Sequence, residues 1–294
     1  MNKTSRAVSS DERTASAFAR SWNTLPEGSV YTVEQFEDWM APLNQSDFSG
    51  KRVLEMGCGN GSLLIHSVSW NPSFLLGIDL GESTQSASSN LRKSGFDNWK
   101  IEQADMVGFQ SDGFDLVYCI GVLHHLESPF EGLCSVVANV KDGGKFHCWV
   151  YAKEGNLVVR LLVEPLRKLF SKFPWWFTKY LVATPLALPV YAYAKTLSAL
   201  SFLSFVKRLP LAEYCFWIAK REIAFFRHVI FDQLVTPKTH YIARSDVAEW
   251  LGRFGEITPD SIYVIQRNGN SWKFGGTIHR GGAPSQDGRT SAME

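Results

Sequence analysis

Residues 53–65 read Val-Leu-Glu-Met-Gly-Cys-Gly-Asn-Gly-Ser-Leu-Leu-Ile, and this stretch decides the fold. The apolar run 53–56 predicts a buried strand, and the apolar residues after the third glycine predict the start of a helix. Strand, glycine turn and helix together bring backbone N–H groups and a helix N-terminus up to a ligand. Glycine has no Cβ atom, so a ligand can lie directly against the main chain there.

The spacing of the glycines separates this turn from two common nucleotide-binding motifs. It reads G-x-G-x-G with Glu55 two residues before Gly57, whereas the dinucleotide pattern reads G-x-G-x-x-G. No G-x-x-x-x-G-K-[ST] occurs, so a phosphate cradle is not indicated. An acid beside the turn favours a ligand that carries an ammonium group. Here the chain resembles the class I S-adenosylmethionine-dependent methyltransferases, whose first motif is similar to residues 55–61. The resemblance implies that the methionine part of the cofactor is held by Glu55, Gly57, Cys58, Gly59 and Gly61.

Two further predicted strands, residues 74–79 and 99–106, end in or near acids that suit the same cofactor. Residues 74–79 are apolar and close on Asp79, 22 residues after Gly57. An acid there can accept hydrogen bonds from both ribose hydroxyls, or it can cap the following helix. The resemblance adds Leu80 to the cofactor site, together with Asp105 and Met106, which match the acid and the apolar residue that meet adenine.

Residues 114–126, Phe-Asp-Leu-Val-Tyr-Cys-Ile-Gly-Val-Leu-His-His-Leu, predict a fourth strand that leads to two histidines. The resemblance implies that backbone near Ile120 lies by the sulfonium centre. His124 and His125 are candidate catalytic residues, because a histidine with a pKa near ~6.5 can take a proton from a hydroxyl, thiol or amine. Adjacent side chains point in different directions, so we expect one to face the acceptor and the other to bond a neighbouring loop. Methyl transfer can also depend on alignment alone.

Composition excludes several functional classes. The 294 residues are 45% hydrophobic and 20% charged, which predicts a globular protein with a sizeable core. A net charge of +1 gives no general case for nucleic-acid binding. The five cysteines form no C-x-x-C pair and the N-terminus has no apolar core of a signal peptide, so we expect free thiols and a cytoplasmic protein. No ligand set has metal spacing, so no metal is expected.

The segments around the motifs supply candidates for binding the acceptor. Residues 15–43 predict short helices that either pack on the core or cover the cofactor, with Tyr31 and Trp39 among their aromatic residues. Residues 142–144 predict a turn, and residues 145–151 predict a fifth strand. Tyr151 ends this strand and so lies on the ligand side of a doubly wound sheet. Tyr241 and Arg244 precede a capped helix in a loop that can enter the acceptor pocket.

The segment 157–235 is apolar, aromatic and interrupted by prolines, which predicts several short helices. It holds eleven Lys and Arg against four Asp and Glu, a local charge of +7. We expect it to cap the ligand edge of the sheet and build an acceptor pocket, with a dimer interface or an interfacial membrane surface as further roles. Its prolines, hydroxyl residues and Lys195 argue against a spanning helix. Arg160 and Arg167 are candidates for holding an anionic acceptor.

The chain as a whole predicts an α/β, Rossmann-like fold: a seven-stranded, mostly parallel sheet with a helical insertion before the last two strands, which form a hairpin at Asn268-Gly269. The expected parts are an N-terminal helical flap, a cofactor-binding core, the insertion, the end of the core and a disordered tail, over residues 1–49, 50–152, 153–238, 239–280 and 281–294. The resemblance implies a methyltransferase acting on a small, hydrophobic or aromatic molecule. The alternatives are a lipid or macromolecular acceptor docked on the insertion, or a protein that binds the cofactor without catalysis.

Overall fold

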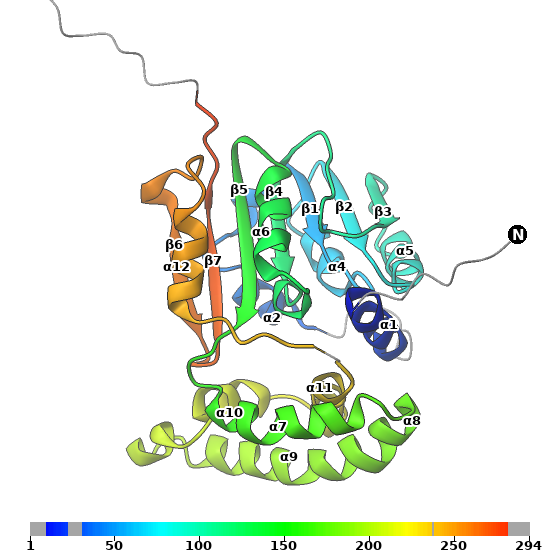
Figure 1. Ribbon diagram of the computed structural model, residues 1–294, viewed down its shortest axis with the longest axis vertical. Coiled ribbons are helices and arrows are strands. Elements are labelled where there is room, and N and C mark those ends of the chain that lie inside the picture. Colours follow the sequence, from blue (N-terminus) through cyan, green and yellow to red (C-terminus); the bar gives the residue numbers. More distant parts are fainter. Residues whose placement is uncertain (1–9, 23–30, 237, 282–294) are drawn as a thin grey trace, which may run out of the picture.

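A seven-stranded sheet forms the centre of the upper part of the molecule in Figure 1, with the strand order β3-β2-β1-β4-β5-β7-β6. The first five strands run parallel, and β7 lies antiparallel to both β5 and β6. The strands are β1 Arg52–Met56, β2 Phe74–Asp79, β3 Trp99–Gln103, β4 Phe114–Ile120, β5 Val140–Tyr151, β6 Tyr263–Arg267 and β7 Ser271–Thr277. This is the mostly parallel, Rossmann-like sheet that the sequence predicts.

The computed structural model of the protein describes residues 10–22, 31–236 and 238–281. The tail predicted to be disordered therefore lies outside the described residues, apart from its first residue. The helices outside the insertion are α1 Ser10–Trp22, α2 Val33–Met40, α3 Gln45–Phe48, α4 Ser62–Val68, α5 Thr84–Arg92, η1 Leu123–His125, α6 Pro129–Ala138, α12 Arg244–Gly252 and η4 Pro259–Ser261.

Helices cover both faces of the sheet, because successive side chains of a buried strand point to opposite sides. In β1, Leu54 and Met56 pack in one cluster with residues of α6 and α12, which lie in front of the sheet in Figure 1. Val53 packs in a second cluster with residues of α2, α4 and α5. The apolar run that precedes the glycine turn is thus buried on both faces, as expected for a central parallel strand.

The helical insertion forms a separate layer beneath the core in Figure 1. It consists of α7 Leu157–Phe170, α8 Trp175–Phe177, the π-helical turn η2 Thr178–Ala183, α9 Thr184–Ala199, the 3-10 turn η3 Ser204–Arg208, α10 Ala212–Ile218 and α11 Ile223–Val235. Helix α11 packs against α7 and α9 on one side and meets α1 on the other. Within the described residues, no helix combines the length and the apolar character needed to cross a membrane.

The fifth strand corrects one sequence-based expectation. Residues 142–144 were predicted as a turn before a strand that starts at 145, but β5 runs from Val140 to Tyr151 and contains them. Phe114 pairs with Val140 and Leu116 pairs with Lys145, so these residues form a bulge within the strand. A Cβ on Gly144 would lie 2.9 Å from the Phe114 carbonyl oxygen, so this close approach of two strands requires glycine.

The terminal hairpin is as predicted. Asn268 and Gly269 both adopt positive φ, 51° and 65°, in the turn between β6 and β7. Pairing of β7 with β5 then adds the hairpin to the parallel sheet.

Candidate active site

A cavity of about 430 Å³ lies at the carboxyl ends of the central strands, between the sheet and the insertion. One end, here called the glycine-turn end, is lined by residues 57–60, Glu55, Asp79 and Asp105. The other end, here called the aromatic end, is lined by Tyr31, Trp39, Trp149, Tyr151, Tyr214, Trp217, Phe225 and Tyr241. Open α/β sheets bind ligands in the crevice outside the carboxyl ends of their strands, and this cavity occupies that crevice.

The glycines of the turn are required by the backbone. Gly57, Gly59 and Gly61 have φ values of +82°, +53° and +76°. A Cβ on Gly57 would lie 2.3 Å from a γ-methyl group of Val122, so no other residue fits there without displacing that side chain. Gly57 and Gly59 line the cavity, whereas Gly61 lies outside the lining and begins α4, with Ala87 closely packed against it.

Asp79 ends β2 and points its carboxylate at the glycine turn. One oxygen accepts the N–H of Gly59 at 2.9 Å, and the other accepts the N–H of Gly81 at 2.7 Å and the Ser83 hydroxyl at 3.4 Å. Burial raises the pKa of Asp79, and the two backbone N–H groups act in the opposite direction. The side chain is therefore fixed at the cavity wall, and the oxygen that accepts from Gly59 has a further lone pair for a ligand hydroxyl.

Glu55 lies deeper, at the end of β1, with only 2% of its surface exposed. Its carboxylate accepts a hydrogen bond from the Tyr118 hydroxyl at 3.1 Å. Burial raises the pKa of Glu55 to about 8, against the lowering effect of that hydrogen bond. A cation placed beside this carboxylate would favour its ionised form, because opposite charges stabilise each other in a buried site.

The remaining residues predicted to hold the cofactor also line the cavity: Cys58, Leu80, Asp105, Met106 and Ile120. Asp105 lies just beyond β3, where one of its oxygens accepts the N–H of Val107 at 2.9 Å. The four neighbouring strand ends, of β3, β2, β1 and β4, thus bring together residues that are far apart in the sequence. Their roles toward a cofactor stay predictions.

The two histidines follow β4 in η1 and have different surroundings. His125 lines the cavity, and its Nδ1 lies 3.0 Å from the Lys238 carbonyl oxygen and 3.2 Å from the Thr239 hydroxyl. Because a carbonyl can only accept, Nδ1 carries the proton and Nε2 keeps its lone pair. Burial lowers the pKa of His125 to about 3. His124 is fully buried outside the lining, with its ring centroid 4.2 Å from that of Tyr151.

The sequence predicted that one histidine faces the acceptor and the other bonds a loop. In the structure His125 does both: it lines the cavity and bonds the loop that carries Lys238. Neither ring nitrogen of His124 has a hydrogen-bond partner among the described residues, and burial lowers the pKa of His124 well below its ordinary value. His124 therefore packs as a neutral aromatic ring.

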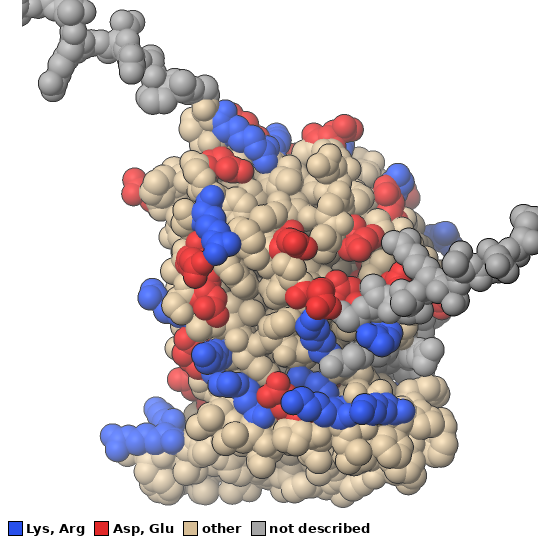
Figure 2. All heavy atoms as spheres, viewed as in Figure 1, with Lys and Arg blue, Asp and Glu red and all other residues tan. Residues whose placement is uncertain are grey.

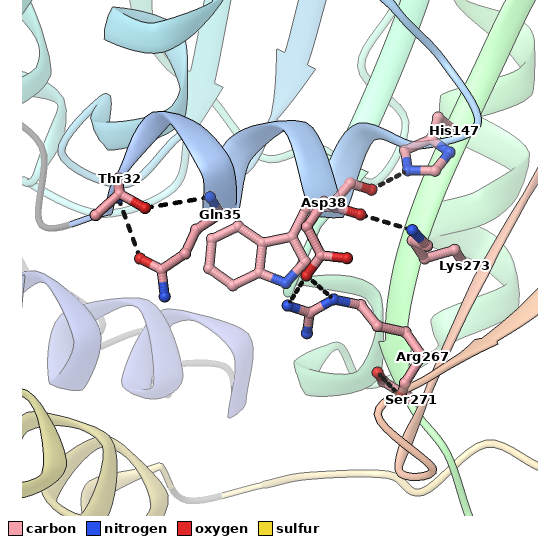
Figure 3. Close-up of polar contacts among 8 residues, drawn as sticks. Thr32, Gln35, Asp38, His147, Arg267, Ser271 and Lys273 are labelled. Atoms are coloured by element: carbon pink, nitrogen blue, oxygen red, sulfur yellow. Dashed lines mark hydrogen bonds and ion pairs between the residues drawn. The ribbon is translucent and has the colours of Figure 1, made fainter. Parts of the chain in front are cut away.

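Helix α2 is fixed to the sheet by polar contacts, which Figure 3 shows. The Arg267 guanidinium pairs with the Asp38 carboxylate, and the Lys273 ammonium donates to the Asp38 carbonyl oxygen at 2.6 Å. His147 bonds the Trp39 carbonyl oxygen at 2.8 Å. Arg267 also lies over the rings of Trp39 and Trp217, at 5.4 and 4.9 Å from their centroids. These contacts hold Trp39 of the N-terminal segment against Trp217 of the insertion.

The aromatic end contains three buried polar atoms without a hydrogen-bond partner in the described part of the chain. They are the indole nitrogens of Trp39 and Trp149 and the hydroxyl of Tyr241. Buried donors are nearly always satisfied in native proteins, and an unpaired one calls for a ligand or a water molecule. The lining residues therefore provide an apolar surface with a few free hydrogen-bonding atoms.

Three arginines predicted to serve the acceptor do not line the cavity. Arg244 is exposed at the start of α12, where its backbone N–H donates to Glu154 at 3.0 Å. Arg160 lies 6.0 Å from the ring centroid of Tyr241. Arg167 is 3% exposed and donates two hydrogen bonds of 2.7 Å to Gln233, so it joins α7 to α11. Because neither Arg160 nor Arg167 lines the cavity, the structure gives no evidence that they bind an anionic acceptor.

Several lining residues were not foreseen individually from the sequence. Gln233 donates to the Tyr151 hydroxyl at 2.8 Å and so connects the insertion to the end of β5. Phe18 of α1 lies with its ring centroid 5.0 Å from that of His125. Tyr214 and Trp217 come from α10. The aromatic richness of the insertion predicted an aromatic lining, but no local pattern distinguished these side chains from ordinary core residues.

Comparison with known proteins finds a domain family that matches part of the chain. Residues 47–165 match the family model of a methyltransferase domain. An uncharacterized protein of Synechococcus sp. is 33% identical over 123 residues, which are 40% of this chain and 30% of that protein. A tRNA U34 carboxymethyltransferase of Desulfotalea psychrophila is 30% identical over 104 residues, 33% of this chain and 32% of that enzyme. A ubiquinone biosynthesis O-methyltransferase of Neisseria meningitidis is 27% identical over 150 residues, 48% of this chain and 62% of that enzyme. The chain thus spans about a third of the length of the first two relatives.

Solved structures show the same fold. An O-methyltransferase family protein from Burkholderia thailandensis has a TM-score of 0.51 at 10% identity, over 85% of this chain and 56% of that one. Residues 47–165 thus match a methyltransferase domain, and the chain has the fold of an O-methyltransferase family protein.

Proposed function

We propose that this chain transfers a methyl group from S-adenosylmethionine to a small, largely hydrophobic or aromatic molecule. The observation that carries the proposal is a single cavity whose lining includes both the glycine turn and the aromatic end. A donor at one end and an acceptor at the other would meet within it, and holding two reactants in line is the main requirement of such a displacement.

The glycine-turn end fits the cofactor by the chemistry of its residues. Bound there, S-adenosylmethionine supplies an electrophilic methyl group. Glu55 would face its ammonium group, Asp79 would accept hydrogen bonds from its ribose hydroxyls, and Asp105 would accept from its adenine amino group. Gly59 supports this fit, because it lines the cavity and nothing lies within 4 Å of the position that a Cβ would take, so its backbone is open there.

The aromatic end favours a neutral or weakly polar acceptor. Its rings offer a large apolar contact area, and the free donors of Trp39, Trp149 and Tyr241 can each bind one polar atom. Arg267 is the one Lys or Arg side chain in the lining as described, and it is already paired with Asp38. An anionic acceptor would therefore lack a free cationic partner.

His125 would orient the acceptor. A pKa of about 3 keeps it neutral and makes it a weak base at neutral pH. Its Nε2 lone pair can still accept a hydrogen bond from a hydroxyl, thiol or amine and turn the nucleophilic atom toward the methyl group. The ubiquinone methyltransferase relative and the tRNA-modifying relative act on different kinds of molecule. We therefore propose the acceptor from the residues that line this cavity and not from the relatives.

Isotope transfer tests this function. The full chain is incubated with methyl-labelled S-adenosylmethionine and with small-molecule extracts separated by polarity. We expect label in an apolar fraction, and loss of that label with Asp79→Asn. A chain that binds S-adenosylhomocysteine but labels no small molecule would contradict the proposal and favour a role in binding alone.

The five cysteines, all free, fit a reducing compartment, and we propose a cytoplasmic location.

A further inference from the structure

The insertion carries an exposed apolar face that the proposed reaction does not use. Of the 21 large apolar side chains that are exposed in the described part of the chain, 18 lie between residues 157 and 223. They include Leu161 and Leu162 of α7, Trp176 of α8 and Leu188 of α9. Soluble proteins rarely expose a contiguous apolar area of this kind unless it meets a partner or a membrane.

The most exposed of these residues, Phe202, lies close in sequence to another exposed phenylalanine, Phe205. Phe202 is 78% exposed just before η3, and Phe205 within η3 is 59% exposed. Neither lines the cavity. Residues 173–206 contain no Asp or Glu, and their only charged residues are Lys179 and Lys195. Two protruding phenylalanines on a segment without acids form a suitable wedge for insertion among lipids.

Basic side chains border this face. Figure 2 shows the helical layer edge-on at the bottom of the molecule, where its lowest part is free of charged side chains in this view and Lys and Arg follow its upper margin. Lys168 lies in the last turn of α7 and Lys172 follows that helix, and both are exposed. Lys207 and Arg208 end η3, two and three residues after its exposed phenylalanine. An apolar face with a basic border is the pattern of helices that lie in the interface of an anionic membrane.

A second copy of this chain is the main competitor for the face. A symmetric dimer would place the same border on both sides of its interface. The segment 157–235 carries seven more basic than acidic residues, so the two borders would repel each other. Anionic headgroups complement the same border, and the charge therefore favours a bilayer.

We propose that the insertion docks the protein on an anionic lipid bilayer through the exposed faces of α7, α8, α9 and η3. The face lies one helix layer away from the aromatic end of the cavity: Val159 and Val163 of α7 line the cavity beside the exposed Leu161 and Leu162, and Val190 of α9 both lines the cavity and is 40% exposed. Docking would thus hold the acceptor end next to the lipid, a consequence that rests on the proposed function.

Co-sedimentation of the full chain with vesicles tests the docking without any turnover. We expect the protein to sediment with vesicles of phosphatidylcholine mixed with phosphatidylglycerol, to sediment far less with phosphatidylcholine alone, and to be released as salt is raised. The double variant Phe202→Ser, Phe205→Ser should lower the partition coefficient by about a hundredfold. Neutralising Lys207 and Arg208 to Gln should lower it by about tenfold.

A matched control removes two exposed apolar side chains elsewhere. Ile262→Ser, Ile265→Ser alters β6 and the residue that precedes it, outside the proposed docking face, and should leave vesicle binding unchanged. All these variants should bind S-adenosylhomocysteine as the unmodified chain does, which separates failure of docking from failure of the cofactor site. Wild-type protein that ignores anionic vesicles would overturn the proposal. A second result would also overturn it: the unmodified protein is a stable dimer, the Phe202→Ser, Phe205→Ser variant is a monomer, and neither protein binds vesicles.

Discussion

The core and the insertion use their apolar residues in opposite ways. In β1 the four residues from Val53 to Met56 are buried, and the polar atoms around them are tied to neighbouring strands. In α7 the one fully buried side chain is Arg167, while most leucines of the helix face outward. The core therefore encloses most of its hydrophobic surface, whereas the insertion leaves many of its large apolar side chains exposed. The two regions also share the cavity: the core supplies the glycine turn and part of the aromatic end, and the insertion adds Tyr214, Trp217 and Phe225 to the aromatic end.

The largest expected effect comes from the glycine turn. Gly57→Ala should lower the affinity for S-adenosylhomocysteine by about a hundredfold, because left-handed backbone strain of ~1–2 kcal/mol adds to the clash with Val122. Calorimetric titration measures the affinity and a thermal melt measures the stability. Gly50→Ala is the matched control, since Gly50 has φ of +70° with open space around its Cβ position. It should lower stability while leaving affinity unchanged, and equal losses of affinity in both variants would contradict the assignment.

Asp79→Asn should have the next largest effect. A hydrogen bond to a charged group contributes ~1.5–3 kcal/mol, so the affinity for S-adenosylhomocysteine should fall about tenfold to a hundredfold. Asp115→Asn serves as its control, because Asp115 is engaged with Arg52 and Lys141 at the opposite end of the sheet. The titration should separate the two variants clearly, and an unchanged Asp79→Asn affinity would remove that residue from the cofactor site.

The pH dependence of binding should report Glu55. Its pKa of about 8 means that it is mostly protonated at neutral pH, and an ammonium group binds the ionised form better. Affinity should therefore rise as pH increases through the pKa of Glu55 and decline at higher pH, where the α-amino group of the ligand loses its proton. Calorimetry across pH 6 to 9 should show this maximum, and Glu55→Gln should abolish the rise on the acidic side. An identical profile in the variant would exclude Glu55 as the partner of the ammonium.

The smallest effect on cofactor binding is expected at the aromatic end. Phe225 lines the cavity from α11, and Phe225→Ala should change the affinity for S-adenosylhomocysteine by about twofold or less, since contact energies are local. The same variant should reduce methyl transfer to an apolar acceptor. A loss of affinity as large as that of Asp79→Asn would show that the two ends of the cavity do not act separately.

The sequence predicted the core well because its signals are local. The glycine spacing of residues 57–61 and the acid that ends β2 depend on a few neighbouring residues, and parallel strands necessarily bring their ends to one edge. The bulge that keeps residues 142–144 within β5 depends on pairing with β4, which no local pattern shows.

The insertion could not be predicted to the same depth. Arg167 was a candidate for holding an anionic acceptor, yet it is buried outside the cavity lining, where Gln233, 66 residues away, accepts its hydrogen bonds. The two histidines of η1 read alike, and only their distance from the loop at Lys238 separates them. Such roles arise from contacts between distant segments, and helix periodicity carries no information about them.

The most direct test of the account is the structure of the protein with S-adenosylhomocysteine bound. We predict that the ligand's amino acid part lies at Glu55 and the glycine turn, with its ribose hydroxyls at Asp79. Its sulfur should face the aromatic end, on the side of His125 and Tyr151. A ligand bound outside this cavity, or one whose sulfur faces away from the aromatic end, would contradict the claim that donor and acceptor meet in a single cavity.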